Sequence, residues 1–268
     1  MKRIIAILLS VLFLCTVGSG CQSAVTNANR STSEVVVFAA ASMTETLEEI
    51  EKLYVKQHPD IKLTFNFDSS GTLKTQIEEG AKCDLFISAA QKQMNGLSDG
   101  GYINAATRIN LLENKVALCT AENSKAGIQS YDDMKSHLKA GDILMAIGNE
   151  DVPVGQYTQK IFSYYDLDEK ALADRGILTY GSNVKEVTSQ ITEGAVDCGI
   201  IYRTDAYSAK LKITDTATEE MCGQVIYPAA VLSASKHADA AKGFLDYLQT
   251  EEASAIFEKV GFTPLATR

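Results

Sequence analysis

Residues 35–44 read VVVFAAASMT and contain the two elements from which the fold of this chain can be worked out. The run at residues 35–40 is short, apolar and rich in valine, which is typical of a strand buried on both faces. Ser42 follows this run, and Leu47 and Ile50 of the next segment recur at helical spacing. The stretch therefore predicts a buried strand that leads directly into a helix.

The same alternation continues along the chain. Residues 61–67 alternate as a strand, the next helix ends at Gly80, and residues 84–88 form another strand. Further apolar runs predict strands at residues 115–119, 143–147, 199–202 and 229–232. Strands that alternate with helices predict an α/β fold in which each sheet is mostly parallel and flanked by helices.

A short motif that occurs twice indicates two similar halves. QIEEGA at residues 76–81 returns as QITEGA at residues 190–195, an offset of 114 residues. Each copy is followed by an aspartate, Asp84 or Asp197, at the start of a short strand. We therefore expect two lobes built alike.

The first twenty residues predict export. Lys2 and Arg3 precede an almost wholly apolar run at residues 4–17, which is too short for a comfortable membrane span. Small residues then lead to Cys21 as in a lipoprotein processing site, although Gly18 stands where such sites usually carry an aliphatic residue. We expect a signal peptide at residues 1–20, lipid on Cys21 and a flexible tether over residues 21–33. A plain signal peptide that is cut nearby is the alternative.

Composition and motifs argue against several classes of protein. The formal net charge of −9 disfavours nucleic acid as a partner. The mature chain has no G-x-S-x-G or P-loop motif, and its histidines form no H-E-x-x-H pattern, so we expect no enzyme. The cysteines lack zinc-site spacing, and we interpret them as buried thiols, with a disulfide as the alternative. These are Cys83, Cys119, Cys198 and Cys222.

Four strand-to-helix turns carry groups that suit an anion. They lie at residues 39–42, 68–72, 151–155 and 181–184. Such turns gather at the carboxyl edge of parallel strands, and helix starts there expose N–H groups and the positive end of the helix dipole. Each turn alone is more typical of an ordinary helix cap than of a binding site, and Ser42 fits a capping box. The prediction of an anion site therefore rests on the four turns together.

Taken in order, these segments resemble the molybdate-binding proteins (ModA) of ABC importers. The resemblance covers residues 34 to 262 and is carried by AAASMT at residues 39–44, DSSGTL at 68–73, VPVGQY at 152–157 and GIIY at 199–202. Tyr227-Pro228 and Gly261-Phe262 close it. It implies a two-lobed periplasmic-binding-protein fold (type II), with residues 34–112 and 226–268 in lobe one and residues 113–225 in lobe two. Two crossing segments, near residues 112–113 and 225–227, would form the hinge.

The resemblance also implies the binding residues, carried over position by position. The oxyanion would be bound by the hydroxyls of Ser42 and Ser70, the main-chain N–H groups of Val154 and Val184, and the Tyr202 hydroxyl. All of these are neutral donors, so no direct metal-cation ligand and no catalytic residue is implied.

Two positions depart from the family pattern. Val154 stands where a smaller alanine is frequent, and Gly71 stands where some relatives have a third serine. The pocket is therefore expected to differ in shape and to lack a spare donor. Two cations beside the implied site, Lys185 and Arg203, are interpreted as solvated surface residues.

The implied function is transport. We expect an extracytoplasmic solute-binding protein, lipid-anchored at the outer face of the cell membrane, that captures molybdate and tungstate by hinge closure. A monomer without a cofactor would deliver the oxyanion to an ABC permease and, through it, to an ATPase subunit. The alternative is a protein of the same fold for another oxyanion, such as sulfate or phosphate, or for a small organic acid.

Overall fold

The computed structural model describes residues 33–122 and 124–265. The expected signal peptide, the lipidation site Cys21 and nearly all of the expected tether lie outside the described residues. Within them, no helix combines the length and the apolar character that a membrane crossing requires.

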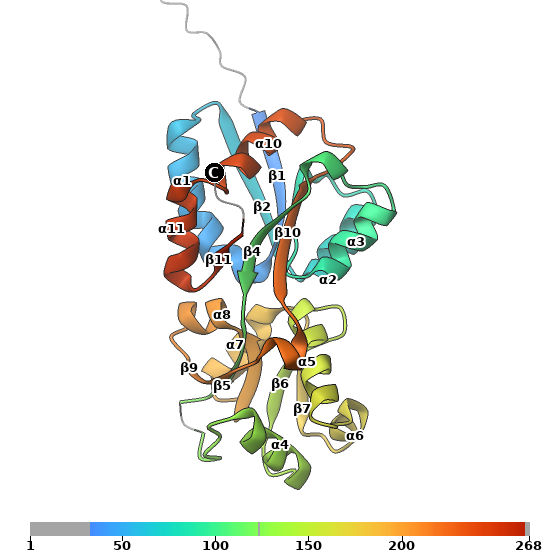
Figure 1. Ribbon diagram of the computed structural model, residues 1–268, viewed down its shortest axis with the longest axis vertical. Coiled ribbons are helices and arrows are strands. Elements are labelled where there is room, and N and C mark those ends of the chain that lie inside the picture. The colour runs from blue at the N-terminus through green and yellow to red at the C-terminus, as the bar shows by residue number, and fades with distance from the viewer. Residues whose placement is uncertain (1–32, 123, 266–268) are drawn as a thin grey trace, which may run out of the picture. The chain divides into compact units, whose positions relative to one another are not determined.

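Lobe one is built on a six-stranded sheet of order β11-β4-β10-β3-β1-β2. Its strands are β1 (Ser33–Ala40), β2 (Ile61–Asp68), β3 (Leu85–Ile87), β4 (Ile109–Asn114), β10 (Val225–Val231) and β11 (Thr263–Pro264). Its helices are η1 (Ala41–Met43), α1 (Thr44–Gln57), α2 (Ser70–Glu78), α3 (Gln91–Asp99), η2 (Ala105–Thr107), α10 (Ala238–Tyr247) and α11 (Glu251–Val260). Figure 1 shows these helices around the sheet.

Lobe two is built on a five-stranded sheet of order β7-β6-β8-β5-β9. Its strands are β5 (Val116–Thr120), β6 (Met145–Gly148), β7 (Leu178–Gly181), β8 (Cys198–Tyr202) and β9 (Lys212–Thr216). Its helices are α4 (Tyr131–Ala140), α5 (Pro153–Tyr164), α6 (Glu169–Asp174), α7 (Val184–Thr192), α8 (Arg203–Ser208) and α9 (Glu219–Cys222). Both lobes belong to one compact unit of the chain.

The α/β class is confirmed, but the sheets are mixed rather than mostly parallel. Strand β1 is parallel to β2 and β3, and β6 is parallel to β7 and β8. The strands next to the crossings are antiparallel, as in the pairs β10–β3, β10–β4 and β5–β8. The reason is the connectivity: the chain leaves lobe one through β4 and returns through β10, so these two strands run in opposite directions (Figure 1).

The repeated motif corresponds to repeated structure. In both copies the helix ends on a glycine of positive φ, Gly80 or Gly194, and the same two main-chain hydrogen bonds follow. The carboxylate of Asp84 accepts from the Val36 N–H, and that of Asp197 accepts from the Leu144 N–H, both at 2.9 Å. The strand orders β3-β1-β2 and β8-β6-β7 also correspond. The two lobes are therefore variants of one β-α-β-α-β unit.

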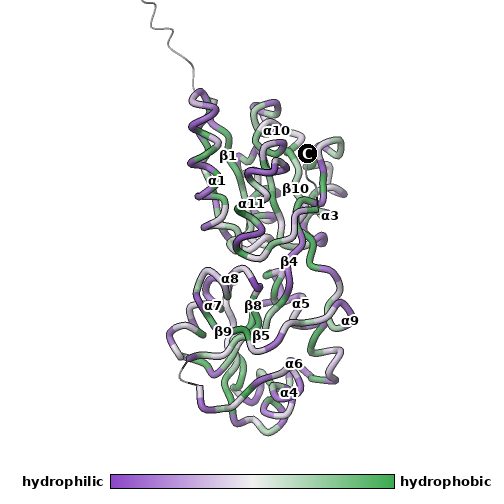
Figure 2. The backbone as a smooth tube through the Cα atoms, turned by 60° about the vertical axis from the view of Figure 1, so that its left-hand side comes forward, coloured by the Kyte–Doolittle hydropathy of each residue, from purple (hydrophilic) through white to green (hydrophobic). Residues whose placement is uncertain are grey.

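The sheets supply the hydrophobic core and position the turns. Strand β8 is wholly buried, and it is coloured as hydrophobic in Figure 2, whereas α1 alternates between hydrophilic and hydrophobic residues along its length. Each repeated unit places two strand-to-helix turns at the carboxyl edge of its parallel strands, after β1 and β2 in lobe one and after β6 and β7 in lobe two.

The repeated aspartate predicts a measurable contribution to stability. Asp84 is buried, and its carboxylate accepts from the Val36 N–H at 2.9 Å and from the Ser235 hydroxyl at 2.7 Å. Replacing Asp84 by alanine leaves a buried N–H unpaired, which should lower the free energy of unfolding by about 2 kcal/mol and Tm by about 4–8 °C. Thermal melting checks this against Asp99→Ala, an exposed position at the end of α3. Equal melting of the two variants would contradict it.

Candidate functional site

The Ser42 hydroxyl lies at the junction of strand β1 and helix α1 and is buried. Its Oγ is 2.8 Å from the Oη of Tyr227 on β10, and Tyr227 Oη also accepts from Asn114 Nδ2 at 3.2 Å. Because Tyr227 accepts from Asn114, it can donate its own proton to Ser42. This arrangement leaves the Ser42 proton free for a further acceptor.

Helix capping does not explain Ser42. Helix α1 begins at Thr44, and its N-cap residue, Met43, makes no side-chain cap. The capping-box interpretation of Ser42 is therefore wrong. The spacing suggested it, but the side chain bonds to Tyr227, which is 185 residues away in the sequence.

Ser70 is the first residue of α2 and is completely buried. Its Oγ accepts from the main-chain N–H of Ala89 at 2.9 Å. The helix is capped by Ser69, whose Oγ accepts from the Thr72 N–H at 3.1 Å. Ser70 is thus not needed as a cap, and its own proton also remains available as a donor.

Two helix starts in lobe two offer main-chain N–H groups. Helix α5 has no side-chain cap and begins with Pro153, which has no N–H, so Val154 carries its first free donor. Helix α7 begins with Val184, and the Asn183 side chain caps the next two N–H groups at 3.0 and 3.1 Å. That cap leaves the Val184 N–H as the donor at the helix start.

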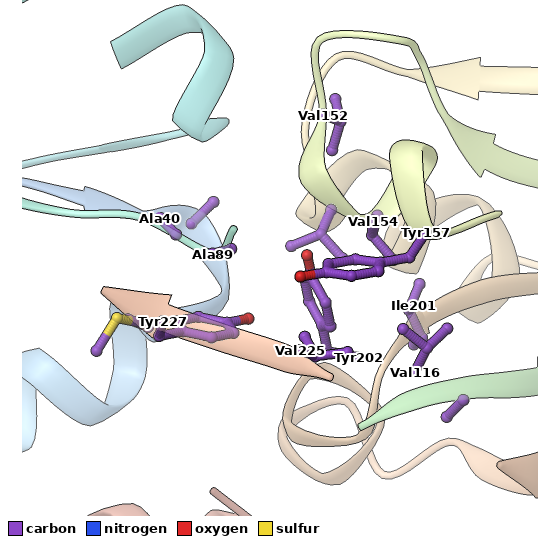
Figure 3. Packing of buried hydrophobic residues seen from close by; sticks show 14 of the residues in the cluster. Ala40, Ala89, Val116, Val152, Val154, Tyr157, Ile201, Tyr202, Val225 and Tyr227 are labelled. Carbon is purple, nitrogen blue, oxygen red and sulfur yellow. The ribbon is translucent and has the colours of Figure 1, made fainter. Parts of the chain in front are cut away.

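Tyr202 ends strand β8 with 1% of its surface exposed. Its hydroxyl makes no hydrogen bond of good geometry within the described part of the chain, but the Tyr227 hydroxyl lies close enough to contribute to its raised pKa. Burial raises the pKa of Tyr202 well above its usual value, so the hydroxyl keeps its proton. Its ring contacts those of Tyr157 and Tyr227, with centroids 6.4 and 5.8 Å away, and Figure 3 shows this cluster beside Val154.

Contacts across the lobes bring the four turns face to face, and the turn that holds Ser42 takes part through the contact of η1 with α7. Asn183 Nδ2 of lobe two donates to Asp68 Oδ1 of lobe one at 3.3 Å. A Cβ on Gly71 would collide with the main-chain carbonyl of Asp151, so glycine is what permits α2 and the turn before α5 to approach this closely. The turns that hold Ser42, Ser70, Val154 and Val184 therefore line one interlobe region, while ligand binding by them stays a prediction.

The two neighbouring cations differ. Arg203 is exposed, as expected. Lys185 is not a solvated surface residue: its Nζ lies 2.8 Å from the Glu45 carboxylate of lobe one and 3.2 Å from Asp205 of its own lobe. The interpretation failed because both partners are remote in sequence, and no local spacing reveals them.

Sequence reasoning also missed the residues that orient the serines. The family resemblance includes Tyr227 but implies no contact of Tyr227 with Ser42. No sequence pattern indicates that Asn114 or the Ala89 N–H bonds to the site. The one available signal was a tyrosine followed by Pro228 within an apolar strand.

The chemistry offered by the region is hydrogen-bond donation by neutral groups. Among the described residues, no cluster of three or more His, Cys, Asp or Glu side chains is placed to hold a metal ion. The four predicted thiols are free and buried, and burial raises the pKa of Cys119 to about 12, so that thiol stays protonated. Neutral donors that converge at helix starts suit an anion better than a cation.

The chain is similar to known proteins over most of its length. A family profile described as bacterial extracellular solute-binding protein matches residues 35–263. The putative ABC transporter substrate-binding lipoprotein YvgL of Bacillus subtilis is 34% identical over 253 residues, which cover 94% of each chain. The molybdate-binding protein ModA of Escherichia coli is 34% identical over 246 residues, covering 88% of this chain and 91% of its own. The predicted resemblance is confirmed.

A solved structure confirms the fold. The periplasmic molybdate-binding protein of Azotobacter vinelandii superposes with a TM-score of 0.75 at 21% identity, covering 85% of this chain and 98% of its own. The predicted two-lobed periplasmic-binding-protein fold is therefore correct.

The Tyr202 hydroxyl predicts an unusual response to mutation. Tyr202→Phe removes a buried hydroxyl that makes no hydrogen bond of good geometry, so the ligand-free protein should lose no stability and melt up to about 4 °C higher. Tyr227→Phe is the matched control, because its hydroxyl is bonded to Ser42 and Asn114 and its loss should destabilise. Equal destabilisation of both variants in thermal melts would show that the Tyr202 hydroxyl is satisfied.

Proposed function

The chain belongs to the bacterial extracellular solute-binding protein family, and on that premise we propose that it captures molybdate, and tungstate with it, for an ABC importer. The proposal includes the five binding residues implied by the resemblance. These are Ser42, Ser70, Val154, Val184 and Tyr202.

The observation that carries the proposal is the set of unused donors. Ser70 accepts a hydrogen bond from the protein and retains its proton, Ser42 can do the same with Tyr227 as the donor, and the buried Tyr202 hydroxyl makes no hydrogen bond of good geometry. A tetrahedral dianion offers acceptors in several directions and can use all of these together with the N–H groups at two helix starts. The similarity to molybdate-binding proteins supports the choice of oxyanion.

Donors without acceptors also account for selectivity. Protonated phosphate carries an O–H that would find no acceptor in such a site, and burying it unpaired costs about 1–3 kcal/mol. Sulfate has no such proton and must be rejected by size, because a cavity fitted to a larger tetrahedron leaves its hydrogen bonds long. The negative charge of the chain does not oppose binding strongly, since charges beyond about 8 Å are screened at physiological salt.

The proposed transport cycle follows from the two lobes. Residues 34–112 with 226–268 would move as one lobe and residues 113–225 as the other, about a hinge at the β4 and β10 crossings. The closed form would dock on a permease whose ATPase subunit drives uptake. We also propose a monomer anchored through Cys21, which the similarity to a substrate-binding lipoprotein supports. No bond-breaking step is part of this function.

A thermal-melt panel on residues 22–268 tests the ligand class. Ligand at a hundred times its Kd adds about 2.7 kcal/mol, which should raise Tm by about 5–10 °C. We expect this shift with molybdate and tungstate but not with sulfate or phosphate. A Tm shift with sulfate or phosphate alone would identify that anion as the ligand in place of molybdate. No shift with any of the four would contradict oxyanion binding.

Serine substitutions test the site. Ser42→Ala and Ser70→Ala each remove one donor to the oxyanion and should weaken molybdate binding about 10- to 150-fold in calorimetry, because a hydrogen bond to a charged group contributes about 1.5–3 kcal/mol. Ser136→Ala is the control, since Ser136 lies exposed on α4. Unchanged affinity in both site variants would remove these residues from the site.

A further inference from the structure

Lys185 connects the two lobes beside the proposed site. It is the second residue of α7 and directly follows Val184. Its Nζ lies 2.8 Å from both carboxylate oxygens of Glu45, which belongs to the first turn of α1 in lobe one. The Lys185 side chain is 31% exposed and the Glu45 side chain is 51% exposed, so this interlobe ion pair is partly open to water.

A buried carboxylate of lobe two also pairs with Lys185. Asp205 in α8 is completely buried and lies 3.2 Å from Lys185 Nζ. Burial raises the pKa of Asp205 to about 6, and Lys185 limits that rise, so the carboxylate is ionised at neutral pH. Separating Lys185 from Asp205 would leave a buried carboxylate without a counter-charge, which is strongly unfavourable. Asp205 therefore orients the Lys185 ammonium even when Glu45 of lobe one is not in contact.

Lys185 in turn stays protonated and positively charged. Burial alone would lower the pKa of Lys185, but Asp205 and Glu45 together hold it above its ordinary value. With carboxylates on two sides, the ammonium directs its protons to protein groups.

A second contact acts on the same helix start. Asn183, on the other side of Val184, donates to Asp68 of lobe one at 3.3 Å. The residues that flank Val184 are thus both held by carboxylates of the opposite lobe. When the lobes separate, both contacts are lost, and nothing from lobe one then fixes the direction of the Val184 N–H.

From this geometry we infer that Lys185 is a positioning residue that sets oxyanion affinity by stabilising the closed form through Glu45. The inference rests on the proposed function. Because the ion pair exists only when the lobes meet, its free energy adds to closure and raises the fraction of binding-competent protein. The effect should appear mainly in the dissociation rate, since the pair must break before the ligand leaves.

A double-mutant cycle tests the pair with molybdate as the probe. Lys185→Gln and Glu45→Gln should each weaken binding about three- to ten-fold, mostly through faster release, and the double variant should be no weaker than the weaker single variant. Glu45→Gln leaves the pairing of Asp205 intact, so its result does not depend on any folding defect of Lys185→Gln. Additive losses, or wild-type affinity in both single variants, would overturn the inference.

Lys259→Gln is the matched control. Lys259 in α11 pairs with Glu49 in α1 at 3.2 Å, but both helices belong to lobe one, so losing that pair cannot bias closure. We expect wild-type affinity for this variant. A loss equal to that of Lys185→Gln would mean that any ion pair on α1 has the same effect and would overturn the inference.

A measurement without ligand separates this inference from the proposed function. Spin labels at Lys56→Cys and Lys139→Cys, on exposed positions of α1 and α4, report the distance between the lobes. The experiment uses residues 22–268, whose four native thiols are buried and should not label. Lys185→Gln and Glu45→Gln should shift the ligand-free distribution to longer distances, even if no oxyanion binds; an unchanged distribution would refute the role in closure. Failure of every oxyanion to bind the wild-type protein would refute only the proposed function.

Discussion

The first N–H groups of an α-helix have no partner inside the helix. Four helix starts in this chain bring such unpaired donors to one interlobe region. Each lobe delivers two such starts to the carboxyl edge of its parallel strands. Ordinary caps satisfy part of this demand, as Ser69 does for α2 and Asn183 does for α7. Under the proposed function, water would satisfy the remaining donors in an open form and an anion would do so in a closed one, which would link the chemistry of the site to the motion of the lobes.

The crossing strands β4 and β10 also contribute side chains to the proposed site. Asn114 ends β4 and Tyr227 lies on β10, and their hydrogen bond joins the two crossings. Tyr227 then bonds to Ser42, so one proposed ligand donor is oriented by the segments that would bend during closure. A change in the crossing angle would therefore alter the donor geometry. This coupling gives a physical reason why a closed hinge and a well-oriented serine occur together.

Sequence patterns predicted the features that depend on neighbouring residues and missed those that depend on remote ones. Alternating apolar runs gave the α/β class, and the QIEEGA motif gave the repeated unit because helix ends and strand starts are local events. The pairing of Ser42 with Tyr227 spans 185 residues, and that of Lys185 with Glu45 spans 140. No periodicity encodes such contacts, so Ser42 matched a capping box and Lys185 matched a surface cation. The antiparallel strands were missed for a related reason, because their direction depends on where the chain returns.

Gly71, which departs from the family pattern, has a structural role at the contact between the lobes. From the sequence, glycine at this position only removes a spare serine donor. In the structure, the space that a side chain would fill is taken by the Asp151 carbonyl of the opposite lobe. A serine here would add a hydroxyl but would push the start of α2 away from the turn before α5, where Val154 offers its N–H. The chain thus gives up one side-chain donor and gains a closer approach of the lobes. Under the proposed function, that approach and the interlobe contacts of Lys185 and Asn183 would let closure contribute to affinity beside the ligand contacts.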